Sequence, residues 1–297
     1  MRRRRRPELS IDRGFARSWL VLPAVLGAAV AIVILWRADG RDIGTAGDSG
    51  PVHVHGLGVN PADGALFVAT HTGLYRLDAT RNKAARVGDR FQDTMGFTIV
   101  GPNRFLGSGH PDLRTEQPPL LGLIESMDAG ENWEPVSLLG EADFHVLRFS
   151  GERVYGYDAS NDRLLTSTDR GKTWQELAKP GQLVDLAIDP GDSRLLVATS
   201  SDGLFESRDA GETWNRLSMK VGLLARPSRE LLYVVDEGGQ LFRSPDGGRQ
   251  LERRGSIGGE PAALLAVSDE ELFVALHDGT IKHSIDGGGT WTVRSTP

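Results

Sequence analysis

The sequence predicts an all-β fold of six similar units closed into a ring, a six-bladed β-propeller, preceded by one N-terminal transmembrane helix. Three observations support this prediction. A short turn of the pattern S-x-D-x-G recurs about every 40 residues. Short runs rich in Val, Leu, Ile and Phe alternate with Gly, Asp, Asn and Ser, and one long apolar stretch stands near the N-terminus.

The N-terminal region is typical of a signal anchor. The segment 19–36, WLVLPAVLGAAVAIVILW, has no charge and a tryptophan at each end, and its 18 residues are long enough to span a bilayer. The arginine-rich residues 1–18 are expected to stay in the cytoplasm, which places the C-terminal domain outside a single-pass cell membrane anchor. A cleaved signal peptide is the alternative, since small residues occur at 44–46, but they lie far from the apolar segment. Residues 37–50 form a polar, glycine-rich linker.

Charge and cysteine content restrict the partners of the folded part. The chain has 34 bases and 40 acids, of which nine arginines and three acids lie in the first 41 residues. The remainder, with 25 bases and 37 acids, carries about −12, which argues against nucleic acid as a partner. The sequence contains no cysteine, which excludes a lipoprotein attachment site and disulfides, so packing alone must hold the fold.

Residues 51–297 divide into six units of four short strands each. One unit reads LVDLAIDP as an inner strand, RLLVATSS as the second, GLFESRD as the third and WNRLSM as the fourth. Aligned on their apolar alternation, the six inner strands begin near residues 55, 95, 145, 184, 222 and 263. The second unit is longer because of residues 110–120, a proline-rich loop that is either a stiff rim of the channel mouth or a tolerated surface insertion.

The recurring turn appears in five of the six units and is missing from the first. Its Ser and Asp side chains can bond backbone amides, its Gly permits a positive φ, and its final Trp can pack between sheets. In the fourth copy Leu251 replaces this tryptophan. We expect a structural role for the aspartates and tryptophans of the five turns, Asp128, Trp133, Asp169, Trp174, Asp209, Trp214, Asp246, Asp286 and Trp291.

These five turns resemble the Asp-box, or bacterial neuraminidase repeat, found in sialidases, sortilin-type receptors and a photosystem II assembly factor. The resemblance covers about five-sixths of the chain and implies a propeller in which each box joins the two outer strands of a blade. It also implies that the aspartates of the turn are structural and lie away from the central funnel. Function does not follow from this fold, because one fold hosts many functions.

The resemblance makes a glycoside hydrolase acting on cell-envelope or extracellular glycans the alternative function. A sialidase would need an arginine triad, a tyrosine nucleophile and a motif of the type F-R-I-P near the first blade, where this chain reads HVHGLGVNP without an arginine. The sialidase motif and the triad are thus not found. The candidate catalytic residues for some other glycoside hydrolysis are Tyr157, Asp158 and Asp143.

Six of the seven histidines fall where inner strands begin or second strands end, positions that share one face of a propeller. His53 and His55 open the first inner strand, and His145 occupies the position of His55 in the third unit. The second strands of three units end at His71, His110 and His277. Carboxylates join this rim, because Asp93 and Asp143 align with His53 and Asp236 ends another second strand.

Imidazoles two residues apart on a strand point to one side, so this rim could hold a divalent transition metal such as zinc. The predicted ligands are His53, His55, His71, His110 and His145, with Asp93, Asp236 and His277 completing a ligand-binding rim. The alternative is a polar channel lining that binds water. The sequence therefore predicts a membrane-tethered, extracytoplasmic propeller that binds a metal, small ligand, glycan or envelope protein at its mouth.

Overall fold

The structure is a computed structural model and describes residues 50–297. The basic segment 1–18, the apolar segment 19–36 and all but the last residue of the linker 37–50 lie outside the described residues. Within residues 50–297, no helix has the length and apolar character needed to cross a membrane.

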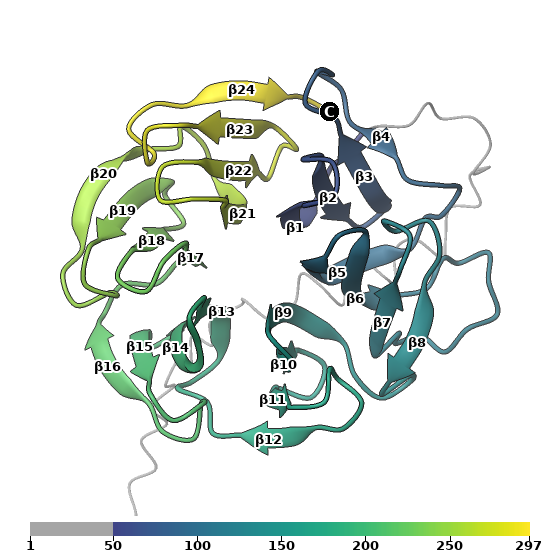
Figure 1. Ribbon diagram of the computed structural model, residues 1–297, viewed down its shortest axis with the longest axis horizontal. Helices are drawn as coiled ribbons and strands as arrows, with labels where there is room; N and C mark the ends of the chain where they lie inside the picture. The colour runs from purple at the N-terminus through teal and green to yellow at the C-terminus, as the bar shows by residue number, and fades with distance from the viewer. Residues whose placement is uncertain (1–49) are drawn as a thin grey trace, which may run out of the picture. The chain divides into compact units, whose positions relative to one another are not determined.

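The described residues form six antiparallel sheets, and each sheet is made of four strands consecutive in the chain (Figure 1). Sheet 1 contains β1 (Val54–Val59), β2 (Leu66–Thr70), β3 (Gly73–Leu77) and β4 (Ala85–Arg86). Sheet 2 contains β5 (Asp93–Gly101), β6 (Arg104–His110), β7 (Leu123–Ser126) and β8 (Glu134–Ser137). Sheet 3 contains β9 (Phe144–Ser150), β10 (Arg153–Asp158), β11 (Arg163–Ser167) and β12 (Gln175–Leu177).

The second half of the ring has the same plan. Sheet 4 contains β13 (Leu183–Asp189), β14 (Asp192–Ser200), β15 (Gly203–Ser207) and β16 (Asn215–Ser218). Sheet 5 contains β17 (Leu223–Ala225), β18 (Leu232–Val235), β19 (Gln240–Ser244) and β20 (Glu252–Ser256). Sheet 6 contains β21 (Pro261–Ala266), β22 (Leu272–Leu276), β23 (Ile281–Ser284) and β24 (Thr292–Ser295).

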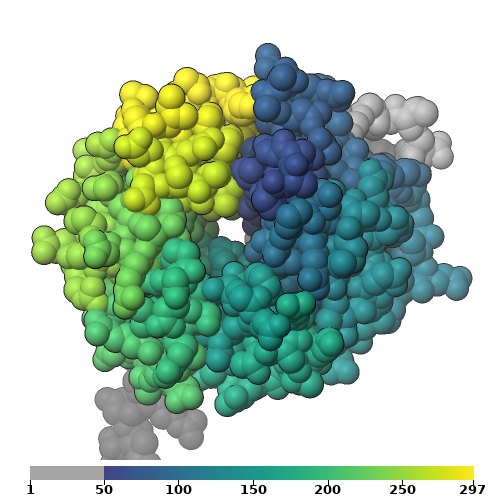
Figure 2. Space-filling view, in the orientation of Figure 1, coloured from purple at the N-terminus to yellow at the C-terminus, as the bar shows by residue number. Residues whose placement is uncertain are grey.

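The six sheets close into a ring around a central channel. Each inner strand contacts the inner strand of the next sheet, and β21 of sheet 6 contacts β1 of sheet 1. The inner strands line a cavity of about 540 Å³, and Figure 2 shows a small opening at the centre of the ring. The six-bladed all-β architecture predicted from the sequence is thereby confirmed for the described residues.

One hydrophobic cluster fills each of the six interfaces between neighbouring sheets. The last residue of the recurring turn packs against five of them: Trp133 between sheets 1 and 2, Trp174 between sheets 2 and 3, and Trp214 between sheets 3 and 4. Leu251 and Trp291 take the same place in the next two interfaces, so the leucine is a smaller substitute. Burial of these side chains drives the sheets together, since apolar area removed from water is the main favourable term in folding.

The recurring turn joins the two outer strands of a sheet through a fixed set of hydrogen bonds. In the copy between β15 and β16, the amide of Gly211 donates to Ser207 Oγ (2.8 Å), and this hydroxyl donates to Asp209 Oδ1 (2.8 Å). The same Asp209 oxygen accepts the amide of Thr213 (2.9 Å). Gly211 has φ +92°, a conformation that glycine adopts with little strain. All five aspartates accept hydrogen bonds within their own turns.

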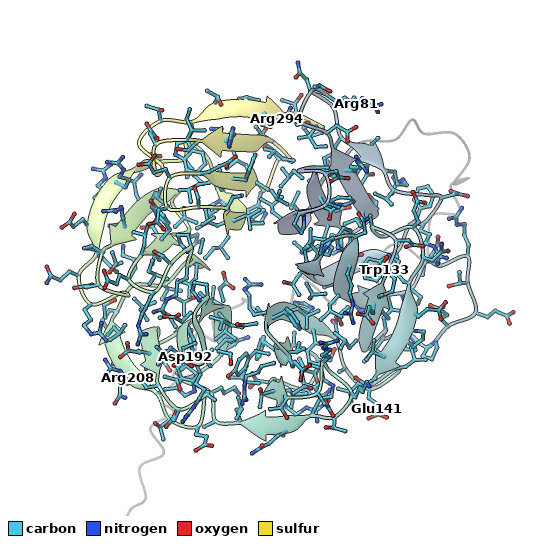
Figure 3. The ribbon with its side chains drawn as sticks, in the orientation of Figure 1. Arg81, Trp133, Glu141, Asp192, Arg208 and Arg294 are labelled. Atoms are coloured by element: carbon cyan, nitrogen blue, oxygen red, sulfur yellow. The ribbon has the colours of Figure 1, made fainter. Side chains whose placement is uncertain are left out.

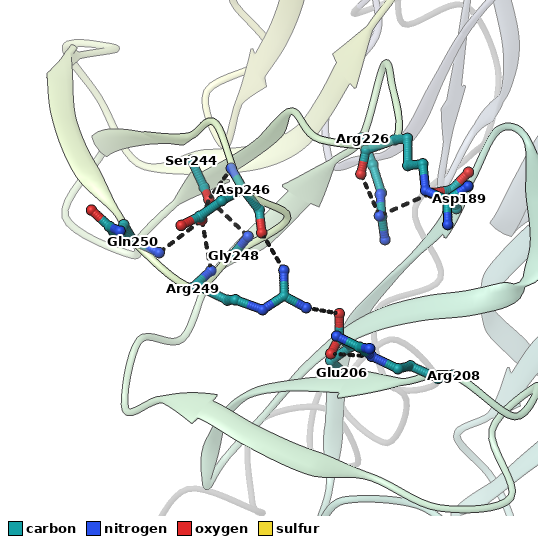
Figure 4. A network of polar contacts seen from close by, with 10 residues as sticks. Asp189, Glu206, Arg208, Arg226, Ser244, Asp246, Gly248, Arg249 and Gln250 are labelled. Carbon is teal, nitrogen blue, oxygen red and sulfur yellow. Dashed lines mark hydrogen bonds and ion pairs between the residues drawn. The ribbon is translucent and has the colours of Figure 1, made fainter.

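Ion pairs add to the apolar contacts between sheets (Figure 4). Arg249, in the turn of sheet 5, lies 2.6 Å from Glu206 of sheet 4. Arg226, which follows β17, pairs with Asp189 at the end of β13 at 3.0 Å, and their side chains are only 6% and 0% exposed. Sheets 4 and 5 are thus joined by charge as well as by packing.

The long loop of the second unit is fixed to the segment before β5. Asp112 Oδ2 accepts the amide of Phe91 (2.9 Å) and pairs with the guanidinium of Arg114 (2.6 Å). That guanidinium also lies over the Phe91 ring, 4.6 Å from its centroid. The start of the loop is thus held against the segment before β5.

Sheets 6 and 1 meet without sharing a strand. Arg294 of β24 donates to the carbonyl oxygens of Asp78 (2.5 Å) and Arg81, beyond β3, and Figure 3 shows Arg294 and Arg81 side by side at this seam. The two ends of the described chain also meet here, because a Cβ placed on Gly50 would lie 2.9 Å from the carbonyl carbon of Pro297. Contacts of Arg294 with backbone carbonyls and the approach of the two chain ends therefore both take part in closing the ring.

Candidate functional site

Strand pairing brings polar residues of sheets 1 to 3 to one mouth of the channel. An inner strand begins beside the end of the second strand of its sheet: Asp93, first in β5, pairs with His110, last in β6. In sheet 1, Val54 pairs with Thr70, which places His53 and His71 just beyond the ends of β1 and β2. The contacts between β1, β5 and β9 then bring the three sheets together.

Imidazoles and carboxylates alternate along a continuous row across these sheets. His71 Nδ1 lies 2.9 Å from Asp93 Oδ2, and the same oxygen lies 3.3 Å from His110 Nδ1. On its other side, His110 Nε2 lies 3.8 Å from Asp143 Oδ2. This oxygen is in turn 2.9 Å from His145 Nε2. Five of the predicted rim residues therefore form one chain of contacts.

His55 and His53 extend this row within sheet 1. The His55 ring lies edge-on to that of His71, with centroids 4.3 Å apart, and the His53 ring lies 5.4 Å from His71. One ligand atom from each of His55, His71 and Asp93 lies within 4.8 Å of the others. We call the seven residues the mouth cluster: His53, His55, His71, Asp93, His110, Asp143 and His145.

Three buried polar atoms of the mouth cluster have no hydrogen-bond partner among residues 50–297. They are His55 Nε2, Asp93 Oδ1 and Asp143 Oδ1. A buried polar atom without a partner costs about 1–3 kcal/mol, so such atoms are rare unless water or an ion satisfies them. Their concentration at one place indicates a site that holds an additional polar group.

The protonation states of His55 and Asp93 suit a cation. Burial and the neighbouring His71 lower the pKa of His55 to about 4, so its ring is neutral near pH 7 and keeps a free lone pair. Burial would raise the pKa of Asp93, but hydrogen bonds from His110 and His71 outweigh it and lower that pKa to about 2. The hydrogen bond to Asp93 raises the pKa of His110. Neutral imidazole and ionised carboxylate are the forms in which these side chains bind metals.

The predicted catalytic pair has other roles in the structure. Asp158 is fully buried; its Oδ1 accepts the amide of Asp143 (3.1 Å) and its Oδ2 pairs with Arg163 (2.8 Å). Tyr157 donates its hydroxyl to Asp162 (2.7 Å), and burial together with this bond raises the pKa of Tyr157 well above its usual range. A tyrosine in this state is a poor nucleophile. Asp158 instead fixes the backbone that carries Asp143.

Asp236 and His277 lie in the other half of the ring. Asp236 Oδ1 accepts the amide of Gln240 (2.9 Å) in the turn between β18 and β19, and its Oδ2 lies 3.3 Å from Lys220 Nζ. His277 is exposed directly after β22. The contacts of Asp236 are those of a turn residue, and the structure places neither residue in the mouth cluster.

The channel also contains a charged pair that sequence reasoning missed. Arg148 of β9 donates to Asp185 Oδ1 (2.5 Å) and to the carbonyl oxygen of Leu186 (2.6 Å) in β13. Asp185 Oδ2 accepts the amide of Leu224 in β17 (2.8 Å). The two side chains thus connect three inner strands. An aspartate within the apolar inner strand LVDLAID was the available signal.

Comparisons with known proteins agree with this architecture. A sequence model described as BNR/Asp-box repeat matches residues 165–176. No curated protein matches the chain.

Similar solved structures include two GH74 enzymes and YCF48. An ancestral GH74 enzyme has 12% identity and a TM-score of 0.54, with 82% of this chain and 38% of that chain covered. The GH74 xyloglucanase from Xanthomonas campestris has 17% identity and a TM-score of 0.52, with 82% and 45% covered. YCF48 bound to D1 peptide has 17% identity and a TM-score of 0.45, with 67% and 81% covered. This chain spans less than half of either GH74 chain, and identities this low show the fold alone.

The repeat model matches the second of the five turns, which connects β11 to β12. The same pattern of Ser, Asp and Gly contacts recurs in the other four turns. Residues 50–297 therefore form a six-bladed β-propeller, and the family model identifies one of its five recurring turns as a BNR/Asp-box repeat.

Proposed function

We propose that this propeller binds a divalent transition metal ion at its mouth through His55, His71 and Asp93. The observation that carries the proposal is the convergence of their ligand atoms to within 4.8 Å of one another. Two of these three residues also contribute a buried polar atom without a partner among residues 50–297, His55 Nε2 and Asp93 Oδ1. Two imidazoles and one carboxylate form a donor set that suits zinc and other divalent transition ions.

The surrounding residues support this role by positioning the ligands. His110 contacts Asp93 Oδ2 at 3.3 Å and orients its carboxylate, as outer partners of metal ligands commonly do. His53 lies beside His71 on the exposed side of the cluster. Three protein ligands leave a coordination position for water or for a group of a bound molecule. The proposed function is thus metal-dependent ligand binding at the mouth.

We also propose that residues 19–36 anchor the propeller in the cell membrane and that residues 37–50 tether it outside. The support is the uncharged apolar segment and its arginine-rich flank. After fractionation of cells that express the chain, the full-length protein should remain in the membrane pellet through an alkaline carbonate wash. Release into the supernatant as a shortened chain would instead indicate cleavage.

Metal titration of the full-length protein in detergent micelles tests the metal proposal. We expect the His71→Ala and Asp93→Asn variants to bind zinc at least about tenfold more weakly than the wild type, because each loses a ligand. His277→Ala is the matched control, since His277 also follows a second strand but lies in sheet 6. Equal zinc affinities for His71→Ala and the control would contradict the proposal.

The structure gives no comparable support to glycoside hydrolysis. Tyr157 and Asp158 are engaged by Asp162 and Arg163, and the similarity to GH74 enzymes extends to the fold only. We therefore propose the binding function alone.

A further inference from the structure

The rotational repeat of the ring places the same pair of residues at two successive sheet boundaries. His71, just after the second strand of sheet 1, faces Asp93 at the start of the inner strand of sheet 2. His110, at the end of the second strand of sheet 2, faces Asp143 just before the inner strand of sheet 3. The second boundary thus repeats the imidazole–carboxylate pair of the first.

The second boundary has two imidazoles and a carboxylate of its own. Asp143 is only 3% exposed, and its Oδ1 has no hydrogen-bond partner among residues 50–297. Its Oδ2 lies 2.9 Å from His145 Nε2 and 3.8 Å from His110 Nε2. Two imidazoles therefore approach one buried carboxylate here, and the residue types are those of the first site.

A single ion cannot use all of these donors. The row of contacts crosses three sheets, and transition ions such as zinc bind about four ligands, whereas the mouth cluster offers five imidazoles and two carboxylates. Asp93 Oδ2 stands between the two groups, in contact with His71 on one side and His110 on the other.

We propose that the mouth holds a second divalent transition metal ion, bound by His110, Asp143 and His145. The inference rests on the proposed function, since it assumes a first ion on His55, His71 and Asp93. Asp93 and His110, which touch each other, connect the two ions. A molecule bound at the mouth would then belong to a class that bridges two cations through a carboxylate or phosphate oxygen.

The imidazole–carboxylate pair is not repeated at the boundary between sheets 3 and 4, because the residue at the corresponding position of sheet 3 is engaged elsewhere. Sheet 3 has Asp158 at the end of its second strand, and this carboxylate is buried against Arg163. Its Oδ1 also holds the amide of Asp143, so it supports the second site instead of forming a third.

Metal stoichiometry of the full-length protein tests the inference. The protein in detergent micelles is stripped with a chelator, loaded with zinc, separated from free metal, and analysed for zinc per chain. We expect two ions in the wild type and in the His277→Ala control, one in His145→Ala, one in His55→Ala, and none in the double variant.

The outcomes separate this inference from the proposed function. One ion in the wild type that is lost in His55→Ala and retained in His145→Ala would overturn the second site and leave the first intact. One ion lost in either variant would mean a single shared ion and would also overturn the second site. No bound zinc in the wild type would overturn the proposed function itself. Should His145→Ala fail to fold, Asp143→Asn removes the second carboxylate with little change of shape and decides the same question.

Discussion

At the scale of single residues, the same kind of side chain has different uses according to its partners. Asp93 and Asp143 each keep one oxygen without a partner among residues 50–297, whereas both oxygens of Asp158 are engaged. The difference lies in a nearby arginine: Arg163 is cross-strand from Asp158, while the two mouth carboxylates face imidazoles. A guanidinium satisfies a carboxylate permanently, and an imidazole leaves it available to a metal.

This difference sets the limit of what the sequence could predict about the site. Alignment of the units identified the strand ends, and five of the histidines assigned to the rim do come together. The alignment could not show that Asp158 pairs with Arg163 and Asp236 with Lys220. The length of the particular turn determines whether each basic side chain reaches its carboxylate. The alignment also assigned His277 to the same rim, although His277 lies in sheet 6 and outside the mouth cluster.

The buried pair of Asp189 and Arg226 provides a prediction at this scale. In Asp189→Asn the amide oxygen can still accept the turn amides of Gly191 and Asp192, but Arg226 loses its counter-charge in a buried place. Leaving one charge of a buried pair uncompensated costs about 3–5 kcal/mol. We expect a loss of about 3 kcal/mol in the free energy of unfolding, measured by urea denaturation.

The double variant Asp189→Asn with Arg226→Met is the control for this prediction. Removal of the guanidinium abolishes the uncompensated charge, so the double variant should recover much of the loss. If it is as unstable as Asp189→Asn, the cost comes from the turn and not from the ion pair.

At the scale of elements, the Asp-box turn both closes the outer hairpin and fixes the distance to the preceding sheet. A Cβ on Gly171 would lie 2.1 Å from Leu123 Cδ2 of sheet 2, and one on Gly288 would lie 2.1 Å from Leu241 Cδ2 of sheet 5. The glycine is thus required by its positive φ and by its neighbour. The first reason follows from the sequence pattern, whereas the second depends on how closely the sheets pack.

Acid should weaken these turns. Hydrogen bonds from the Thr213 side chain and amide, and from Ser207, lower the pKa of Asp209 to about 2, and hydrogen bonds from Thr290 and Ser284 lower that of Asp286 to about 2. Because the pKa is lowered in the folded protein, the charged form of the aspartate stabilises the fold when the pH lies above the usual pKa of 3.8. This contribution is lost as the pH falls from 3.8 toward 2. We expect the free energy of unfolding to decrease over this interval.

The variant Asp209→Asn with Asp286→Asn tests the cause. It should be less stable than the wild type at pH 7, and its stability should fall less steeply between pH 4 and pH 2. Glu212→Gln is the control, because Glu212 is an exposed carboxylate in the same turn. A slope unchanged from the wild type would assign the acid sensitivity to carboxylates outside the turns.

At the scale of the whole molecule, an arginine of the outermost strand makes the same kind of contact at two successive boundaries of the ring. Arg254 of β20 donates to the carbonyl oxygens of Asp286 and Gly287 in the turn of sheet 6. Arg294 of β24 makes the corresponding contacts to Asp78 and Arg81 in sheet 1, although that sheet has no Asp-box. The sequence predicted the missing turn in the first unit, but it could not show that its loop still receives an arginine.

The seam between sheets 6 and 1 should be the weakest boundary, because it lacks the covalent connection present at the other five. We expect Arg294→Ala to lower the free energy of unfolding by about 1–2 kcal/mol and to speed amide hydrogen exchange in β1 and β24. Arg254→Ala removes the same kind of contact at a covalently connected boundary and should cause less local exchange. Equal exchange in the two variants would show that the seam is no weaker than the other boundaries.

Each sheet is built from one uninterrupted stretch of chain, and residues 50 and 297 touch. The order of the sheets around the ring, and not the position of the ends, therefore defines the structure. A circular permutant, joined from residue 297 to residue 50 by a short linker and opened at residues 178–182, should assemble the same toroid. The break would then move to the boundary between sheets 3 and 4, while the metal ligands of sheets 1 to 3 stayed in order.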